Sequence, residues 1–487
     1  MTLLLGIDIG TTATKAVMLD TAQGLVAEAQ HPVTLHADRP GWAEEDVEEW
    51  WSNLAALTRE LVRDGQPVAV GISGMVPCVV LLDARGRPVR RSIQQNDARA
   101  TAEIRQLQEE LADADILQRT GSPISQQSVA PTVRWLARHE PAALAATAAV
   151  MGSYDAMVWR LTGQPSVELN WAVESGLYDL RARAWAPDVL EAVGLDDRLL
   201  PPVRMPADIV GEVTPAAAAE TGLRAGTPVI AGSADHVASA FAAGLVREGD
   251  LLIKLGGAGD ILMVSSTPVT DERLYLDMHL SPGLYLPNGC MASSGSFIRW
   301  FQRELAGGAS LAVLDAEAEA AGPGARGVVA LPYMLGEKTP LNDPLARGAF
   351  IGLSLSHARG DLFRALLESI AFGFRHHLDV FAELGLGPQR VRVTNGGASS
   401  RLWTQVTADV VGLPLEKLRS HPGSALGVAF AAGVAVGAFE AWSDIERFVE
   451  PGEVIEPRDH AAYAEGYARY RALYPALKAI LEQPPRT

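Results

Sequence analysis

The chain has 487 residues, of which 48% are hydrophobic and 20% are charged, which is the composition of an ordinary globular protein. At roughly 150 residues per domain, this length predicts two or three domains, and we expect two larger ones. The formal net charge of −17 argues against a sequence-independent grip on nucleic acid or on an anionic membrane, because both require a positive surface. Any anionic ligand must therefore be met by a local site.

Cysteine content and apolar runs bear on where the protein resides. Cys78 and Cys290 are the only cysteines, too few for a disulfide framework or a cysteine zinc site. The apolar start lacks a basic flank and is interrupted by Asp8, unlike a secretory signal, so we expect a cytoplasmic protein. The run over residues 425–439 is shorter than the roughly 18 residues of a membrane-spanning helix. It is predicted to be a helix packed closely on a sheet.

The first chemical motif is a predicted hairpin over residues 3–20, in which two apolar strands flank a polar turn. Gly10 has no Cβ, so the backbone can turn sharply there and approach a ligand closely. Thr11 and Thr12 offer hydroxyls and Lys15 an ammonium group, which together predict a phosphate-binding turn. The alternative is a surface hairpin whose Thr and Gly residues serve only the turn.

Asp8 lies in the first strand of this hairpin, just before the predicted phosphate-binding turn. A carboxylate there would repel a polyphosphate unless a cation lay between them. Carboxylate oxygens are the hard ligands that Mg²⁺ prefers. We therefore expect Asp8 to be a metal ligand.

Two polar or loop segments in the first half are candidate pocket linings. A strand is predicted to end at Gly74, and the following loop, which includes Met75 and Val76, lies where it could line a pocket. Asn96 and Asp97 belong to a polar cluster just before a helix, and such side chains can hydrogen-bond a polyol. A helix cap centred on Asn96 or Asp97 is the alternative.

Asp235 and His236 follow a predicted buried strand that ends at a Gly-Ser turn. The apolar run over residues 237–245 begins directly after them, which places both side chains at the start of a helix. A carboxylate in this position could merely cap the helix. The functional alternative is a general base at the mouth of a cleft.

The opening pattern recurs at residues 250–264, where two apolar strands flank Gly256, Gly257 and Gly259. The pattern recurs after about half the chain length, which is too long for solenoid repeats, whose periods are about 20 to 50 residues. The recurrence therefore indicates an internal duplication. We therefore predict two similar domains, residues 1–245 and 246–487, each with a phosphate-facing hairpin.

The second half holds one further ligand candidate and two helices without assigned chemistry. Gly396, Gly397 and Ala398 lead from a strand into the predicted helix 402–411, where backbone N–H groups can meet a nucleotide. The apolar stripe of residues 361–385 predicts a core helix. The tail, residues 461–481, reads as a helix whose Tyr-rich face covers the second domain or forms a homodimer contact.

Four sequence segments, in the same order, resemble motifs of the FGGY family of carbohydrate kinases, and together they span nearly the whole chain. Residues 6–15 match its first phosphate motif, residues 232–236 its catalytic Asp segment, and residues 396–400 with Trp403 and Asp409 its adenosine segment; residues 336–353 resemble its C-terminal signature. The resemblance implies an α/β fold of two ribonuclease H-like domains with a cleft between them, as in the superfamily of actin, sugar kinases and heat-shock ATPases.

The resemblance also implies roles, with ATP and Mg²⁺ as cofactors and a small sugar as substrate. Mg²⁺ would be held by Asp8 partly through water, and Asp235 would accept the proton of the attacking hydroxyl. His236 would contact the sugar or serve structure. ATP would contact Gly10, Thr11, Thr12, Lys15, Gly256, Gly257, Gly259, Gly396, Gly397 and Ala398, and the sugar would lie near Met75, Val76, Asn96, Asp97 and Asp235.

Within the family, the sequence is most similar to xylulokinases, but it departs from them near the sugar. Met75-Val76-Pro77 replaces their usual Gln-Met-His, Gln95 a Trp, Thr132 a Lys, His236 an Asn, and Gly257 a common Thr. We expect D-xylulose or a related ketopentose as acceptor, with ribulose, a tetritol or glycerol as alternatives. The alternative outside enzymes is a nucleotide-gated binding protein of the same fold.

Overall fold

The computed structural model describes residues 2–421 and 423–481, which form two α/β units. The first unit contains residues 2–246, 276–286 and 423–449, and the second contains residues 247–275, 287–421 and 450–481. Two units of mixed α/β structure agree with the fold class that the sequence predicts. The units divide after residue 246, where the sequence predicted a division after residue 245, and two later segments belong to the first unit.

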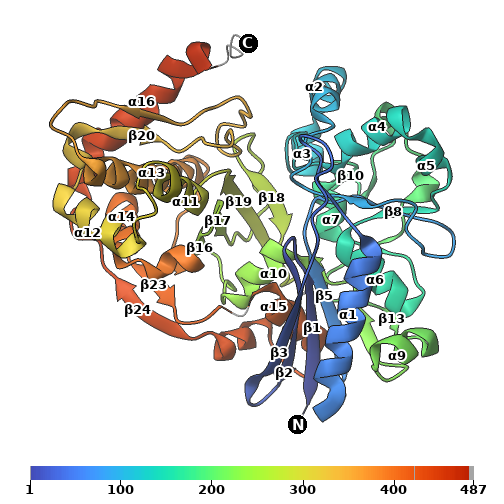
Figure 1. The fold of residues 1–487 in the computed structure, drawn as a ribbon. Coiled ribbons are helices and arrows are strands. Elements are labelled where there is room, and N and C mark those ends of the chain that lie inside the picture. Colours follow the sequence, from blue (N-terminus) through green and yellow to red (C-terminus); the bar gives the residue numbers. More distant parts are fainter. Residues whose placement is uncertain (1, 422, 482–487) are drawn as a thin grey trace. The chain divides into compact units, whose positions relative to one another are not determined.

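The first unit alternates short strands and helices around one sheet (Figure 1). Its strands are β1 (Leu3–Ile9), β2 (Ala13–Asp20), β3 (Gly24–Pro32), β4 (Glu44–Glu45), β5 (Ala69–Gly74), β6 (Val80–Leu82), β7 (Ser92–Ile93), β8 (Ala149–Met151), β9 (Val167–Glu168), β10 (Tyr178–Asp179), β11 (Ala184–Trp185), β12 (Val203–Arg204), β13 (Ile209–Glu212), β14 (Pro228–Ile230) and β15 (Ser233–Ala234). Its helices are α1 (Val47–Leu61), α2 (Thr101–Glu110), α3 (Ile116–Thr120), α4 (Val129–His139), α5 (Pro141–Ala145), α6 (Ser153–Thr162), α7 (Leu169–Glu174), α8 (Pro187–Val193), α9 (Pro215–Thr221), α10 (Asp235–Ala242) and α15 (Ser424–Ala435), with 3-10 turns η1 (Val62–Asp64), η2 (Asp197–Leu199) and η5 (Trp442–Phe448).

The second unit repeats this alternation with longer helices. Its strands are β16 (Asp250–Leu255), β17 (Gly259–Met263), β20 (Val329–Leu331), β21 (Ala349–Ile351), β22 (Arg390–Thr394), β23 (Leu415–Leu418) and β24 (Pro451–Ile455), while β18 (Tyr275–Met278) and β19 (Tyr285–Met291) run across segment boundaries. Its helices are α11 (Gly295–Glu304), α12 (Leu311–Ala321), α13 (Arg359–Glu383), α14 (Arg401–Val411) and α16 (Ala464–Leu481), with 3-10 turns η3 (Ala325–Gly327), η4 (Gly396–Ser399) and η6 (Ala461–Tyr463). No helix in the described part of the chain is long and apolar enough to cross a membrane.

The sheet of the first unit runs in the order β13-β14-β5-β1-β2-β3, and β15 also pairs with β5. The hairpin of β1 and β2 confirms the strand–turn–strand prediction, and Figure 1 shows it in dark blue beside β3. Strand β1 is parallel to β5 with Asp8 opposite Ser73, and β5 is parallel to β15 with Ser73 opposite Ser233. The carboxyl ends of β1, β5 and β15 therefore lie side by side, at the edge where α/β sheets bind ligands.

Helix α15 belongs to the first unit because small residues let it lie directly on β1 and β5. A Cβ on Gly6 would lie 1.8 Å from the carbonyl oxygen of Ala425, and one on Gly71 would lie 2.2 Å from that of Val428. The backbone of α15 thus touches the sheet. This contact confirms the predicted close-packed helix and explains why residues 423–449 leave the second unit.

The core of the second unit forms around the sheet order β19-β17-β16-β22-β23-β24. Strands β16 and β17 form the second hairpin that the sequence predicts, and β16 is parallel to β22. The stripe predicted over residues 361–385 is buried in α13. Tyr463, Tyr467 and Tyr470 of the tail also join this core, so the tail covers the second unit, as one of the two alternatives expected.

Candidate active site

Asp8 and Asp235 stand at the carboxyl ends of neighbouring strands in the first unit. Asp8 lies near the end of β1 and accepts a 2.9 Å hydrogen bond from Ser73 Oγ, while Asp235 follows β15 as the first residue of α10. The Asp235 side chain is 37% exposed, so it is accessible to a substrate. The structure thus brings together the two carboxylates that the sequence singled out.

The environment of Asp8 disfavours its charged form. Burial, followed by the negative charge of Asp235, raises the pKa of Asp8 to about 6, although Ser424, Ser73 and Lys15 act in the opposite direction. Two neighbouring carboxylates repel each other, and a divalent cation between them and a phosphate would relieve that repulsion. No role was predicted for Ser73, which lies in the segment 71–74 that resembles xylulokinases, and Ser424 belongs to no motif.

The turn between β1 and β2 presents polar groups next to Asp8. Its backbone is closed by a 3.2 Å hydrogen bond from Gly10 N to Ala13 O. Thr11, Thr12 and Lys15 are exposed. A Cβ on Gly10 would lie 3.0 Å from Ala13 O, so glycine lets this turn close tightly beside Asp8. The arrangement suits a phosphate-binding turn with an adjacent metal ligand.

The residues predicted to line the sugar site differ in their surroundings. Met75 follows β5, is fully buried, and donates its backbone N–H to Ile9 O at 3.3 Å. Val76 is also buried, whereas Asn96 is exposed. Met75 and Val76 therefore lie at the same strand ends as Asp8 and Asp235, and Asn96 lies in a separate turn after β7.

Asp97 is engaged with protein groups. Its carboxylate accepts bonds from Arg99 Nε at 2.8 Å and Nη2 at 2.7 Å, and from the backbone N–H of Ala43 at 2.6 Å. The Arg99 guanidinium in turn lies 3.7 Å from the ring centre of Trp42. This buried ion pair orders the turn, and the assignment of Asp97 to the sugar stays a prediction.

His236 faces carboxylates on both sides of its ring. Its Nε2 lies 2.7 Å from Asp277 Oδ2, and its Nδ1 lies 3.6 Å from Asp235 Oδ1. Burial alone would lower the pKa of His236, but Asp277, Asp235 and Glu174 outweigh it and raise the pKa well above its usual value. Glu174 and Asp277 come from α7 and β18, so no sequence spacing could have linked them to His236.

In the second unit, two glycine-containing loops follow the adjacent parallel strands β16 and β22. The first loop is held by the start of α11, where Gly295 N donates to Gly256 O at 2.8 Å and Ser296 Oγ to Gly257 O at 2.9 Å. The second loop is η4, whose Gly396 has open space where a Cβ would lie. Backbone at the carboxyl ends of neighbouring parallel strands is a common nucleotide site. Ser296 of α11 was missed, because it stands far from either loop in sequence.

Some predicted nucleotide-binding residues have packing roles. A Cβ on Gly259 would lie 2.7 Å from Met291 Cε, and one on Gly397 would lie 2.1 Å from Trp403 Cζ3. Ala398 is buried in the core of the second unit. These three residues let core side chains approach the loops, and their contacts with ATP stay predictions.

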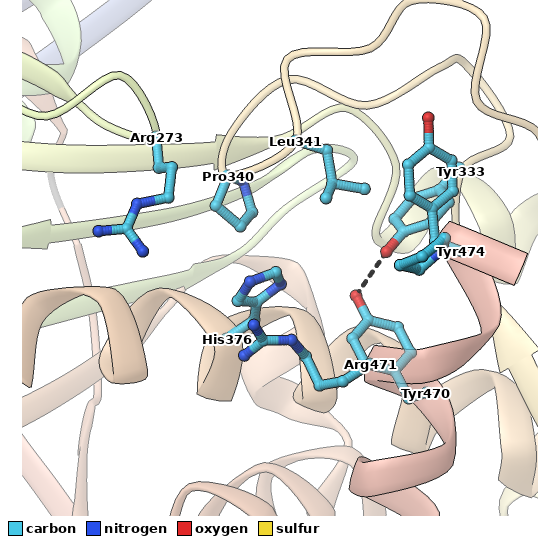
Figure 2. Close-up of a pocket in the computed structure, with 9 residues that line it drawn as sticks. Arg273, Tyr333, Pro340, Leu341, His376, Tyr470, Arg471 and Tyr474 are labelled. Atoms are coloured by element: carbon cyan, nitrogen blue, oxygen red, sulfur yellow. Dashed lines mark hydrogen bonds between the residues drawn. The ribbon is translucent and has the colours of Figure 1, made fainter. Parts of the chain in front are cut away.

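A cavity of about 220 Å³ in the second unit lies among α13, α16 and the segment around Pro340 (Figure 2). Figure 2 shows the hydrogen bond between the Tyr333 and Tyr470 hydroxyls, which measures 3.0 Å. The Arg273 guanidinium at its edge is bound by Asp271 and Glu383. The cavity contains none of the residues predicted to bind ATP or sugar.

Comparisons with known proteins agree with this geometry. The N-terminal domain of the FGGY family of carbohydrate kinases matches residues 3–242, and its C-terminal domain matches residues 252–436. The crystal structure of xylulose kinase from Rhodospirillum rubrum is 44% identical, with a TM-score of 0.93 over 99% of this chain and 100% of that one.

Two curated relatives from Escherichia coli K12 extend the similarity. Its xylulose kinase is 29% identical over 98% of this chain and 99% of its own, and its L-xylulose/3-keto-L-gulonate kinase is 30% identical over 98% and 97%. Both family domains, the relatives over full length and the two sheet-containing units lead to one conclusion. The chain belongs to the FGGY family of carbohydrate kinases and is an enzyme of ATP-dependent sugar phosphorylation.

Proposed function

We propose that the protein phosphorylates D-xylulose or a closely related ketopentose. The observation that carries the kinase mechanism is the placement of Asp8, Ser73 and Asp235 at the ends of three neighbouring strands. The choice of sugar is supported by the 44% identity to the Rhodospirillum rubrum xylulose kinase over 99% of the chain. Other acceptors remain to be compared by experiment, since the similar Escherichia coli enzyme carries the name of two different sugars.

The residues of the first unit fit a magnesium ion with a polyphosphate. Asp8 supplies a hard oxygen ligand whose charge is disfavoured by burial and by Asp235, and a cation would stabilise that charge. Thr11 and Thr12 supply exposed donors in the turn, and Lys15 supplies another from β2, opposite Asp8. We therefore assign Mg²⁺ to Asp8, partly through water, and phosphate oxygens to the turn after it.

The second unit has nucleotide-binding features of its own. Gly256 and Gly257 present backbone next to the start of α11, and Gly396 leaves open space at the start of η4. Backbone N–H groups at such positions favour negative charge. Bound MgATP supplies the transferable phosphoryl group and neutralises the charge that develops during its transfer.

Asp235 acts as the general base in this mechanism. Its partly exposed carboxylate accepts the proton of the attacking sugar hydroxyl and orients that hydroxyl. Met75 and Val76, which follow the neighbouring strand β5, are almost fully buried, so they would support this strand end from the protein interior.

The test is ADP release from MgATP with D-xylulose, L-xylulose, D-ribulose, erythritol and glycerol. We expect the highest kcat/KM for D-xylulose and a loss of about 10²–10⁴-fold in kcat for Asp235→Asn, the usual contribution of a general base. Asp38→Asn, at an exposed surface position, is the matched control and retains activity. ADP release that is slow, indifferent to every acceptor and unchanged in Asp235→Asn would instead support a nucleotide-gated binding protein.

A further inference from the structure

His236 stands between the candidate base and a buried carboxylate of the same unit. Its Nε2 is hydrogen-bonded to Asp277 Oδ2 at 2.7 Å, and its Nδ1 lies 3.6 Å from Asp235 Oδ1, which is ion-pair range. The Asp277 side chain is 2% exposed, so water does not compete for it. Both ring nitrogens thus face protein carboxylates, and neither is directed to a sugar.

The charges around the ring fix its protonation. Asp277 and Asp235 raise the pKa of His236 well above its usual value against the effect of burial. Burial, followed by the charge of Asp277, raises the pKa of the neighbouring Glu174 carboxyl well above its usual range. These shifts favour a doubly protonated His236 beside a protonated Glu174 carboxyl. An imidazolium donates from both nitrogens, so it can address two carboxylates at once.

We propose that His236 is a positioning residue for phosphoryl transfer, anchored by Asp277 through Nε2 and orienting the Asp235 carboxylate through Nδ1. The chain Asp277–His236–Asp235 places a rigid, hydrogen-bonded ring behind the base, so the carboxylate keeps the direction in which it meets the sugar hydroxyl. This inference rests on the proposed function, because it takes Asp235 as the base.

The residue type matters for this role. An Asn amide at the position of His236 could donate to a carboxylate only from its single NH₂ group. Its carbonyl oxygen cannot pair with an ionised carboxylate on the other side. A histidine spans both carboxylates from one backbone position, so this chain has a support for its base that an asparagine would not provide.

The kinetic test compares His236→Asn and Asp277→Asn with the wild type, using D-xylulose and MgATP. We expect kcat to fall about 10- to 100-fold in both variants, because a base misplaced by about 1 Å loses a comparable factor. The KM for ATP should stay within about twofold, since no nucleotide contact is removed. His139→Asn, on the exposed end of α4, is the matched control. Unchanged kcat in either variant would overturn the proposal.

A second test does not depend on catalysis. Histidine labelled with ¹⁵N reports by NMR whether each ring nitrogen carries a proton, and the His236→Asn variant assigns the signal. Both nitrogens should be protonated in the wild type at about pH 8, well above the usual histidine pKa of about 6.5, and Asp277→Asn should yield a neutral ring. A neutral His236 in the wild type would refute the anchoring.

The two tests separate this inference from the function on which it rests. If Asp235→Asn keeps full kcat, Asp235 is not the base and the proposed function fails, whatever the state of His236. If Asp235→Asn is inactive while His236→Asn and Asp277→Asn are fully active, the proposed function holds and the positioning role fails. Adding free imidazole to His236→Ala gives a further check, since partial recovery of kcat requires the ring itself and not the fold.

Discussion

Replacing Asp8 with asparagine should make the ligand-free protein more stable while removing its activity. Burial and the charge of Asp235 raise the pKa of Asp8 from 3.8 to about 6, so the folded protein pays to ionise this side chain at neutral pH. Asn has nearly the same shape and can still accept the hydrogen bond from Ser73 Oγ. It carries no charge, so that cost disappears along with the metal ligand.

The magnitude follows from linkage between ionisation and folding. A pKa shift of one unit corresponds to about 1.4 kcal/mol. The rise of the Asp8 pKa from 3.8 to about 6 therefore limits the gain in the free energy of unfolding to about 3 kcal/mol. Because Asp8 is only half-buried, solvent screening makes the gain smaller than this limit. Spread over a unit of roughly 280 residues, 3 kcal/mol corresponds to an increase of about 5 °C in Tm.

The pH dependence of the stability change in Asp8→Asn tests its sign independently. Above about pH 6 the wild type carries the full cost, and as the pH falls towards 3.8 the folded state takes up the proton and the cost vanishes. The stability gain of Asp8→Asn should therefore be full at about pH 7.5 and shrink as the pH falls to about 5. Scanning calorimetry without Mg²⁺ or nucleotide measures it.

A variant on the same hairpin serves as control with the opposite sign. Backbone N–H groups of Gln23 and Ala22 hold the pKa of Asp20 below its usual value, so Asp20→Asn should destabilise the protein at neutral pH. The reasoning is refuted if Asp8→Asn is no more stable than the wild type at about pH 7.5, or if its gain is the same at about pH 5.

Two further predictions concern the fold that positions the site. Arg99→Met should lower the free energy of unfolding, measured in urea, by about 3–5 kcal/mol, because Asp97 then stays buried without its partner. The double variant Arg99→Met/Asp97→Asn should recover most of this loss. A single variant as stable as the wild type would contradict this account. Gly71→Ala should lower Tm by several degrees, because the new Cβ would lie 2.2 Å from Val428 O. The control Gly387→Ala should leave Tm nearly unchanged, because a Cβ there meets open space. Equal Tm values for the two variants would show that α15 does not touch β5.

Local patterns predicted the hairpins and several helices with little error. The strands of residues 3–20 appear as β1 and β2, and those of residues 250–264 as β16 and β17. These segments read clearly because two apolar runs flank a turn rich in glycine, so the signal is complete within about 20 residues. Asp235 at the start of α10 was predictable for the same reason.

Contacts between distant segments could not be predicted. Helix α15 was expected to pack on a sheet, but only the structure shows that the sheet belongs to the first unit, through Gly6 and Gly71. Glu174 and Asp277 reach His236 from elements 62 and 41 residues away along the chain. One sequence holds no record of such pairings, because they depend on how the sheet is assembled and not on local periodicity.

The prediction for Asp97 shows a second limit of sequence reasoning. Its polar cluster suggested a polyol site or a helix cap, and the structure adds a buried pair of its carboxylate with Arg99, which the sequence did not indicate. Composition identifies a polar side chain as a donor or acceptor, but its partner is fixed by what lies across the fold. The same holds for Gly259 and Gly397, whose missing Cβ atoms make room for Met291 and Trp403.

The central claim is tested most directly by following the labelled γ-phosphoryl group of ATP. Wild-type protein and Asp235→Asn are each incubated with labelled MgATP and D-xylulose, and the products are separated. The account predicts that the label appears in a sugar monophosphate with the wild type and that this product is lost with Asp235→Asn. Label found only in inorganic phosphate, in equal amounts with both proteins, would contradict it.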